Sequence, residues 1–195
     1  MATTQLTRQN ARATGPCTQA AVVVRSHGMR WAVAGIAVAV LVADQVTKSL
    51  AAAGSISQTA QPGWLSVSLA SNHGATGGVG IGSPILITLI VLTVTALAAA
   101  FAVRATSRTA AICLAAVVGG ALGNLADRLL RSPGLGGGGV VDWIHLSFAD
   151  GRGATLNIAD LAVLLGVIGA TTAMVIAHKH TAPASKPAQV AIAAI

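Results

Sequence analysis

The fold is decided by three pieces of one stretch: GGALGNLADRLL at residues 119–130, VVDWIHLSF at 140–148 and LNIADLAVLLGV at 156–167. The first and last pieces belong to apolar segments of membrane length, and the middle piece lies between them. All five acidic residues of the chain are aspartates, and four of them lie in this stretch. An acid in or beside a membrane segment is costly, so each one is a candidate for a functional site. Asp142 and Asp160 stand where the chain leaves and re-enters a membrane-length segment, and we expect them to act as a pair.

The composition is that of an integral membrane protein. The 195 residues are 54% hydrophobic and 9% charged, with a mean hydropathy of +0.75. Soluble domains carry about 25% charged residues, and a chain of this size could not hide so much apolar surface in its own core. The net charge of +7 does not indicate a nucleic-acid partner, because the basic residues flank the apolar segments as topology signals do. The two cysteines, Cys17 and Cys113, predict neither a disulfide framework nor a metal site.

Four apolar segments are long enough to span a membrane, and they predict an all-α integral membrane fold with four transmembrane helices. We expect a four-helix domain over 29–178, a mobile cytoplasmic tail at 1–28 and a C-terminal tail at 179–195. The first segment also resembles a cleavable signal peptide, with basic residues before it and alanines after it. Asp44 and Lys48 continue it at helical spacing, which favours an uncleaved helix. The predicted spans are 31–52, 82–103, 109–130 and 156–177.

The connections between the spans differ in composition. Residues 53–81 carry no charge, and the weak alternation at 64–69 is compatible with short strands. Residues 131–155 are rich in glycine and predict a flexible loop.

The basic residues predict the orientation. They precede the first span, lie between the second and third, and follow the fourth, so these three regions belong in the cytoplasm under the positive-inside rule. Both termini are then inside, and connections 53–81 and 131–155 face outward. Polar residues at the helix ends converge at this outer face. They are Asp44, Lys48, Asn124, Asp127, Arg128, Asp142, Asn157 and Asp160.

Two polar pairs have the spacing of neighbours on a helix. Asp44 and Lys48 are four residues apart and can form an ion pair, although Lys48 could instead extend to the lipid headgroups. Asn157 and Asp160 are three apart at the start of a helix, where the helix dipole favours a carboxylate.

A third polar group ends the third span. Asn124, Asp127 and Arg128 lie at positions i, i+3 and i+4. An arginine in a membrane segment needs a carboxylate, so we expect Asp127 and Arg128 to form a structural clamp.

Two neighbouring carboxylates predict a particular chemistry. Two such groups a few ångströms apart cannot both ionise, so they share a proton. One can then take a proton from water while the other protonates or polarises a peptide carbonyl, with no metal and no cofactor. The HExxH, GxSxG and Walker A motifs of other hydrolases are absent.

These motifs together resemble those of bacterial lipoprotein signal peptidases, the signal peptidase II family, over residues 31–177. The matching pieces are DQVTK at 44–48, Asn72-x-Gly74-Ala75, GNLADR at 123–128, VVDW at 140–143 and NIAD at 157–160. The resemblance implies a four-helix aspartic endopeptidase of the bacterial cell membrane, with a small β-cradle at the outer face. It implies that the substrates are diacylglyceryl prolipoproteins within the membrane lipid, cut just before the lipid-modified cysteine. By motif match, Asp142 and Asp160 are the catalytic pair, and the substrate-binding or supporting residues are Asp44, Lys48, Asn72, Gly74, Asn124, Asp127, Arg128 and Asn157.

Some positions depart from the pattern of that family. Gly77 stands where an aromatic residue is expected, Leu156 replaces a phenylalanine, and the loop between Arg128 and Asp142 is longer. These departures concern the shape of the substrate groove. A different class of function is a small multipass carrier or assembly subunit whose acids relay protons or hold helices together. A relay would place an acid near the middle of the bilayer, whereas these acids cluster at helix ends.

Overall fold

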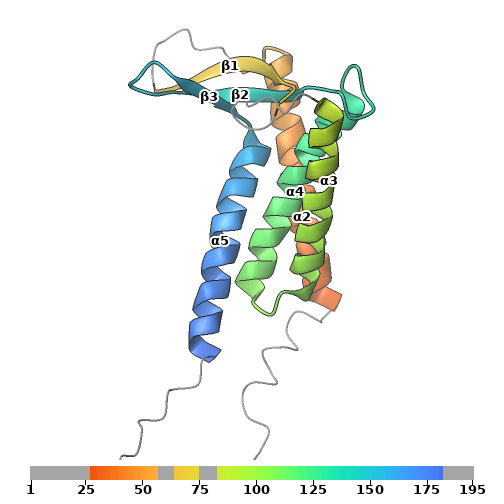
Figure 1. Ribbon diagram of the computed structural model, residues 1–195, viewed down its shortest axis with the longest axis vertical. Coiled ribbons are helices and arrows are strands. Elements are labelled where there is room, and N and C mark those ends of the chain that lie inside the picture. The colour runs from red at the N-terminus through yellow and green to blue at the C-terminus, as the bar shows by residue number, and fades with distance from the viewer. Residues whose placement is uncertain (1–26, 57–63, 75–82, 182–195) are drawn as a thin grey trace, which may run out of the picture.

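The computed structural model describes residues 27–56, 64–74 and 83–181. Most of the two expected tails, and Gly77, lie outside the described residues. Four helices run nearly parallel to one another in a bundle, with a small sheet across one end (Figure 1). They are α2 (His27–Ala52), α3 (Pro84–Arg104), α4 (Arg108–Leu130) and α5 (Ile158–Thr181).

The four helices are each long and apolar enough to cross a membrane, which confirms the four predicted spans. α2 begins at His27 rather than at residue 31, and α5 continues to Thr181. Helix α5 therefore takes in residues 179–181, the start of the predicted C-terminal tail. Large apolar side chains such as Phe101 of α3 and Leu165 of α5 remain exposed on the outside of the bundle, as they should where the solvent is lipid.

Helix α4 is the centre of the bundle, because it contacts α2, α3 and α5. Its glycines permit that close packing. A Cβ atom at Gly119 would lie 2.5 Å from the carbonyl oxygen of Ala37 on α2, and one at Gly120 would lie 2.5 Å from that of Ala159 on α5. Small residues at such contacts let membrane helices approach closely. The bundle geometry thus depends on positions that only glycine can fill.

A three-stranded antiparallel sheet, in the order β1-β2-β3, closes one end of the bundle. Its strands are β1 (Leu65–Asn72), β2 (Val140–Ser147) and β3 (Gly153–Leu156). Asp142 of β2 pairs with Ala70 of β1, and Ile144 pairs with Leu156 at the end of β3. Leu156 leads through Asn157 into α5, so the sheet fixes where that helix begins. The expected small β-cradle is therefore present.

The prediction of a flexible loop over 131–155 was wrong. This segment contains strand β2 and most of strand β3, and its glycine-rich part is held by backbone hydrogen bonds. The N–H groups of Gly136 and Gly138 each donate to the carbonyl oxygen of Arg128 at 3.0 Å. The hydroxyl of Thr88 on α3 donates to the carbonyl oxygen of Gly136 at 2.7 Å. Glycines are required here by close packing, since a Cβ atom at Gly138 would lie 2.6 Å from the carbonyl oxygen of Asp127.

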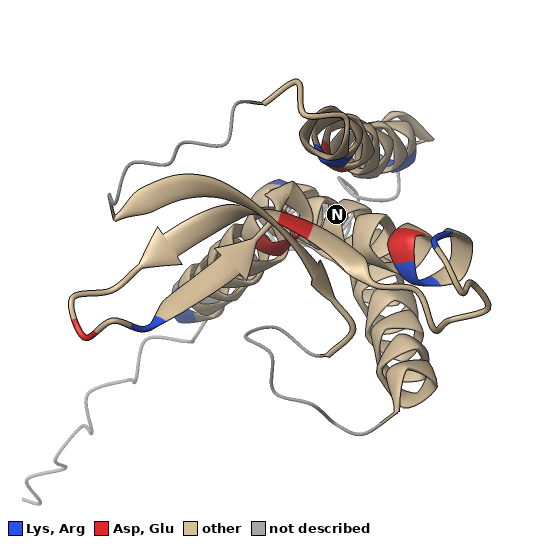
Figure 2. Cartoon of the chain, turned by 90° about the horizontal axis from the view of Figure 1, so that it is seen from above, with Lys and Arg blue, Asp and Glu red and all other residues tan. Residues whose placement is uncertain are grey.

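The two ends of the bundle differ in charge. The described acids lie at the sheet end, in the last turns of α2 and α4, in the sheet and in the first turn of α5 (Figure 2). Lys48, Arg128, Arg131 and Arg152 also lie at the sheet end, whereas the opposite end carries the basic residues Arg30, Arg104, Arg108 and Lys179 and none of the described acids. The polar chemistry of the bundle is therefore concentrated beneath the sheet.

Candidate active site

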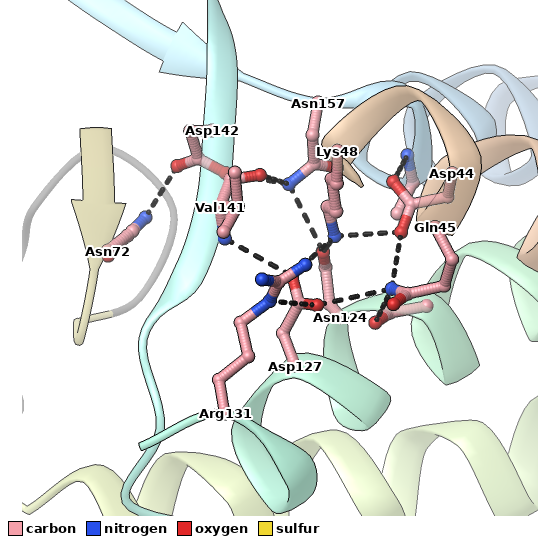
Figure 3. Close-up of polar contacts among 12 residues, drawn as sticks. Asp44, Gln45, Lys48, Asn72, Asn124, Asp127, Arg131, Val141, Asp142 and Asn157 are labelled. Atoms are coloured by element: carbon pink, nitrogen blue, oxygen red, sulfur yellow. Dashed lines mark hydrogen bonds and ion pairs between the residues drawn. The ribbon is translucent and has the colours of Figure 1, made fainter. Parts of the chain in front are cut away.

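Asp142 lies on β2, the central strand of the sheet. Its side chain is only 1% exposed. Asn72, at the end of β1, donates from Nδ2 to Asp142 Oδ2 at 3.2 Å. Asn157, just before α5, donates from Nδ2 to Asp142 Oδ1 at 2.6 Å. Each carboxylate oxygen therefore already receives one N–H group from a neighbouring element (Figure 3).

Asp160 lies in the first turn of α5 and forms a reciprocal cap with Asn157. The backbone N–H of Asp160 donates to Asn157 Oδ1 at 2.9 Å, and the backbone N–H of Asn157 donates to Asp160 Oδ2 at 3.1 Å. This arrangement satisfies N–H groups that a helix start leaves free. Asn124 of α4 donates from Nδ2 to Asp160 Oδ1 at 2.9 Å. The predicted pairing of Asn157 with Asp160 is confirmed.

Asn157 brings the two acids together. Its side-chain amide donates to Asp142, and its backbone N–H donates to Asp160. Burial, together with the negative charge of Asp160, raises the pKa of the Asp142 carboxyl to about 6 against the lowering effect of the hydrogen bonds from Asn72 and Asn157. A carboxyl group with such a pKa can give and take a proton near neutral pH.

A buried ion cluster lies beside the two acids, between α2 and α4. Lys48 Nζ lies 2.7 Å from Asp44 Oδ2 and 2.9 Å from Asp127 Oδ2, and Lys48 and Asp44 are both 0% exposed. The predicted Asp44–Lys48 pair is confirmed, and the alternative in which Lys48 extends to the headgroups is excluded. Asp44 also accepts the backbone N–H of Ala159 through Oδ1 at 2.9 Å, which ties α2 to the start of α5.

The predicted clamp between Asp127 and Arg128 was wrong. Asp127 bonds Lys48, the Nε group of Arg131 at 2.8 Å and the backbone N–H of Val141 at 3.1 Å. Arg128 instead donates from Nη2 to the carbonyl oxygen of Gly74 at 2.8 Å. Adjacent residues on a helix point about 100° apart, so Asp127 faces the ion cluster while Arg128 faces the other side of α4.

A mostly apolar groove of about 530 Å³ opens on that other side, between α3, α4 and α5. Asn124, Arg128 and Asp160 are its polar residues. The side chain of Arg128 is 4% exposed, and its Nε and Nη1 groups have no hydrogen-bond partner among the described residues. Buried donors of this kind are rare and call for an acceptor. The groove therefore combines an apolar channel, one free guanidinium edge and one of the two paired acids.

Comparison with known proteins identifies the family. The sequence model of "Signal peptidase (SPase) II" matches residues 36–176. The chain belongs to the signal peptidase II family. The peptidase is 37% identical over 137 residues to a lipoprotein signal peptidase of Bifidobacterium longum subsp. infantis, an alignment that covers 68% of this chain and 72% of that protein. It is 40% identical over 105 residues to one of Streptomyces coelicolor, over 54% of this chain and 50% of that protein.

Solved structures agree with this assignment. The peptidase superposes on the structure of a bacterial membrane enzyme with a TM-score of 0.62 and 26% identity, over 78% of this chain and 92% of that one. A second bacterial membrane enzyme gives a TM-score of 0.55 and 28% identity, over 73% and 89% of the two chains. The peptidase is thus a multi-pass bacterial membrane protease that removes signal peptides from prolipoproteins.

The predicted site residues of the peptidase come together beneath the sheet. One hydrogen-bonded network contains Asp44, Lys48, Asn72, Asn124, Asp127, Asp142, Asn157 and Asp160. The carbonyl oxygen of Gly74 accepts a hydrogen bond from Arg128. Sequence reasoning missed Arg131 and Gln45, whose Nε2 donates to Asp127 Oδ1 at 3.2 Å. The spacing of four residues between Asp127 and Arg131 was a usable signal for that ion pair. Gln45 carried no local signal for its contacts with α4, because the carbonyl oxygen of Gly123 and the carboxylate of Asp127 lie on another helix.

Proposed function

We propose that this peptidase is an aspartic endopeptidase, with Asp142 and Asp160 as its catalytic pair, that cuts diacylglyceryl prolipoproteins just before the lipid-modified cysteine. The observation that carries the proposal is the double role of Asn157, which donates to both carboxylates and so holds them around one site. The pKa of about 6 for Asp142, raised by burial and by the charge of Asp160, favours a pair that holds a single proton.

A pair with one proton can hydrolyse a peptide bond directly. A water between the carboxyl groups loses a proton to the ionised carboxylate as its oxygen attacks the scissile carbonyl carbon. The protonated carboxyl gives its proton to the carbonyl oxygen, which yields a tetrahedral diol. The carboxylate that took the water proton then protonates the leaving nitrogen as the C–N bond breaks, and the diol returns a proton to the other carboxylate. The pair ends with one proton, as it began.

The groove supports a lipid-modified substrate. Its apolar walls from α3 and α5 suit an acyl chain or the apolar part of a signal peptide, and Asp160 lies at its polar end. The Nε and Nη1 groups of Arg128, which have no acceptor in the described part of the chain, suit a carbonyl oxygen of the substrate. Asp142 is oriented by Asn72 and Asn157, and Asp160 is oriented by Asn124 and Asn157. The helices that carry these residues are held together by Asp44, Lys48 and Asp127.

We further propose that the sheet end faces outward across the bacterial cell membrane, with both termini in the cytoplasm. The basic residues at the opposite end of the bundle support this orientation under the positive-inside rule. Lipoprotein precursors would then meet the catalytic pair on the outer face.

The test is cleavage of a synthetic diacylglyceryl prolipopeptide by the purified peptidase in detergent. Asp142→Asn and Asp160→Asn should each abolish cleavage while the protein remains folded, because asparagine keeps the shape but cannot exchange the proton. The matched control is Asp150→Asn in the exposed β2–β3 turn, where the carboxylate pairs only with Arg152, and this variant should cleave normally. A chelator should have no effect. Cleavage by either catalytic variant, or dependence on an added divalent metal, would refute the proposal.

A further inference from the structure

We propose that Lys48 is a positioning residue of the active site: its buried ammonium group holds the side-chain amide of Asn124 in the one orientation that donates to Asp160. This inference rests on the proposed function, since it takes Asp160 to be one of the catalytic acids. It assigns to Lys48 a part in the reaction beyond holding α2 against α4.

The ammonium group of Lys48 is fully occupied. It has three N–H donors and no acceptor. These donors meet Asp44 Oδ2 at 2.7 Å, Asp127 Oδ2 at 2.9 Å and Asn124 Oδ1 at 2.8 Å. The Lys48 side chain is 0% exposed, so water does not compete for these bonds. The third of the three contacts is not an ion pair, and structural pairing of α2 with α4 does not require it.

That third contact decides which way the Asn124 amide points. Asn124 Oδ1 also accepts the side-chain N–H of Asn157 at 3.1 Å. If the amide turned over, its NH₂ group would face the ammonium group of Lys48 and the NH₂ group of Asn157. Three donors would then meet with no acceptor, and a buried donor without a partner is destabilising. The NH₂ group of Asn124 must therefore face Asp160 Oδ1, which it meets at 2.9 Å.

The Asn157 amide is held in the same manner by a different donor. Its Oδ1 accepts the backbone N–H of Asp160, which cannot reverse its role. Its NH₂ group is then directed at Asn124 Oδ1 and Asp142 Oδ1. The amides of Asn124 and Asn157 thus present N–H groups to the acids because a donor-only group, Lys48 or a helix N–H, occupies their oxygens. Hydrogen bonds donated to a carboxylate stabilise its charged form, which is the form that takes a proton from the attacking water.

The test uses charge-balanced variants. Lys48→Met alone would leave Asp44 without its counter-ion and would test folding rather than positioning. Asp44→Asn/Lys48→Met removes one charge of each sign, and Asn at residue 44 can still accept the N–H of Ala159. Asp127 keeps Arg131, Gln45 and the N–H of Val141. The matched control is Arg131→Gln, which removes a cation from the same carboxylate but leaves the contact between Lys48 and Asn124 intact.

We expect kcat of the double variant to fall about 10- to 100-fold, the effect of losing one hydrogen bond to a charged group. KM should change by less than about threefold, since kcat alone reports an interaction used in the reacting complex. Arg131→Gln should keep kcat within about twofold. The decisive readout is a double-mutant cycle on kcat with Asn124→Leu. Because Lys48 acts through Asn124, adding Asp44→Asn/Lys48→Met to the Asn124→Leu variant should cause no further loss of kcat.

Other results would overturn the inference. Losses that multiply in the cycle would mean that Lys48 and Asn124 act independently, and an unchanged kcat in the double variant would mean that the amide needs no lysine. Failure of the charge-balanced variant to fold would make Lys48 a determinant of the fold and not a positioning residue. These outcomes are distinct from failure of the proposed function, which would appear as cleavage by Asp142→Asn or Asp160→Asn.

Discussion

The side-chain amide of Asn157 donates to Asp142 Oδ1 at 2.6 Å, from a position just before α5 to the middle of strand β2. This bond joins the sheet to the helix that carries Asp160. The buried carboxylates are thus placed by main-chain elements that pair in a fixed register, with Asp142 opposite Ala70 and Ile144 opposite Leu156. A small displacement of the sheet would therefore disturb the geometry of both acids.

The first prediction concerns stability and pH. The folded pKa of Asp142, raised by burial to about 6, lies above the ordinary value of 3.8. Between these values the folded protein holds a proton that the unfolded chain has lost, so the free energy of unfolding falls as pH rises through this window. Asp142→Asn does not ionise and should escape that loss. Its stability relative to the parent should therefore increase between pH 4 and pH 7, by about 2–3 kcal/mol.

Denaturant unfolding in detergent at both pH values would measure this difference. Asp150→Asn is the control with the opposite sign, because the hydrogen bonds from Arg152 lower the pKa of the Asp150 carboxyl. It should gain no stability as the pH rises. An Asp142→Asn protein whose stability runs parallel to that of the parent at all pH values would contradict the raised pKa.

The second prediction separates Arg128 from its neighbour Arg131. Arg128 has two buried N–H groups without a hydrogen-bond partner among the described residues and lines the groove, whereas Arg131 pairs with Asp127. Arg128→Met should lower kcat/KM about 10- to 100-fold, since hydrogen bonds to charged groups contribute about 1.5–3 kcal/mol. Its melting temperature should fall only by what the hydrogen bond to the carbonyl oxygen of Gly74 contributes, because Asp127 keeps both of its counter-ions.

The control is Arg131→Met, which should lower the melting temperature while cleavage continues. Cleavage kinetics and thermal unfolding of both variants would check the assignment. If the pattern were reversed, with Arg128→Met unstable and Arg131→Met inactive, the proposed substrate contact of Arg128 would be wrong.

The third prediction concerns the contact between α4 and α5. A Cβ atom at Gly120 would lie 2.5 Å from the carbonyl oxygen of Ala159 and 3.1 Å from Val163 Cγ2. Because the nearer atom is backbone, α5 must move, and Asp160 moves with it. Gly120→Ala should therefore cost about 1–3 kcal/mol and should also lower kcat.

Gly35→Ala on α2 is the matched control. A Cβ atom there meets nothing within 4 Å, so the variant should be neutral or slightly stabilising and fully active. Thermal melting and the cleavage assay measure both effects. Equal behaviour of the two variants would show that the close approach of α4 and α5 does not matter for the active site.

The fourth prediction concerns orientation in the membrane. Ser55 follows α2 at the sheet end, and Thr106 lies in the turn between α3 and α4 at the opposite end, and both are exposed. In a variant with Cys17 and Cys113 replaced, Ser55→Cys should react with an impermeant thiol reagent added to intact spheroplasts. Thr106→Cys should react only after the membrane is opened. Labelling of both from the outside would contradict the proposed topology.

Local spacing made much of this protein readable from its sequence. Runs of apolar residues predicted the four spans, because only a helix satisfies its own backbone groups in lipid. The Asp44–Lys48 and Asn157–Asp160 pairs were predictable because helix geometry brings residues four or three positions apart onto one face. Asp142 and Asp160 were singled out because carboxylates at the ends of apolar segments are costly. The Asp127–Arg128 clamp failed because both residues were assigned to one face of α4.

Only the tertiary structure decided which polar groups meet across elements. The contacts of Lys48 with Asn124, of Asn124 with Asp160 and of Asn157 with Asp142 join residues 76, 36 and 15 positions apart. They depend on the rotation of each helix about its axis, which the close glycine contacts of α4 and the pairing of β2 with β1 and β3 determine. The glycine-rich connection was predicted to be flexible because its hydrogen-bond acceptor is also decided by the tertiary structure. That acceptor is the carbonyl oxygen of Arg128, which is available because α4 ends there. The sequence by itself thus determined the helices and the acids, and the packing of the helices determined the site that those acids share.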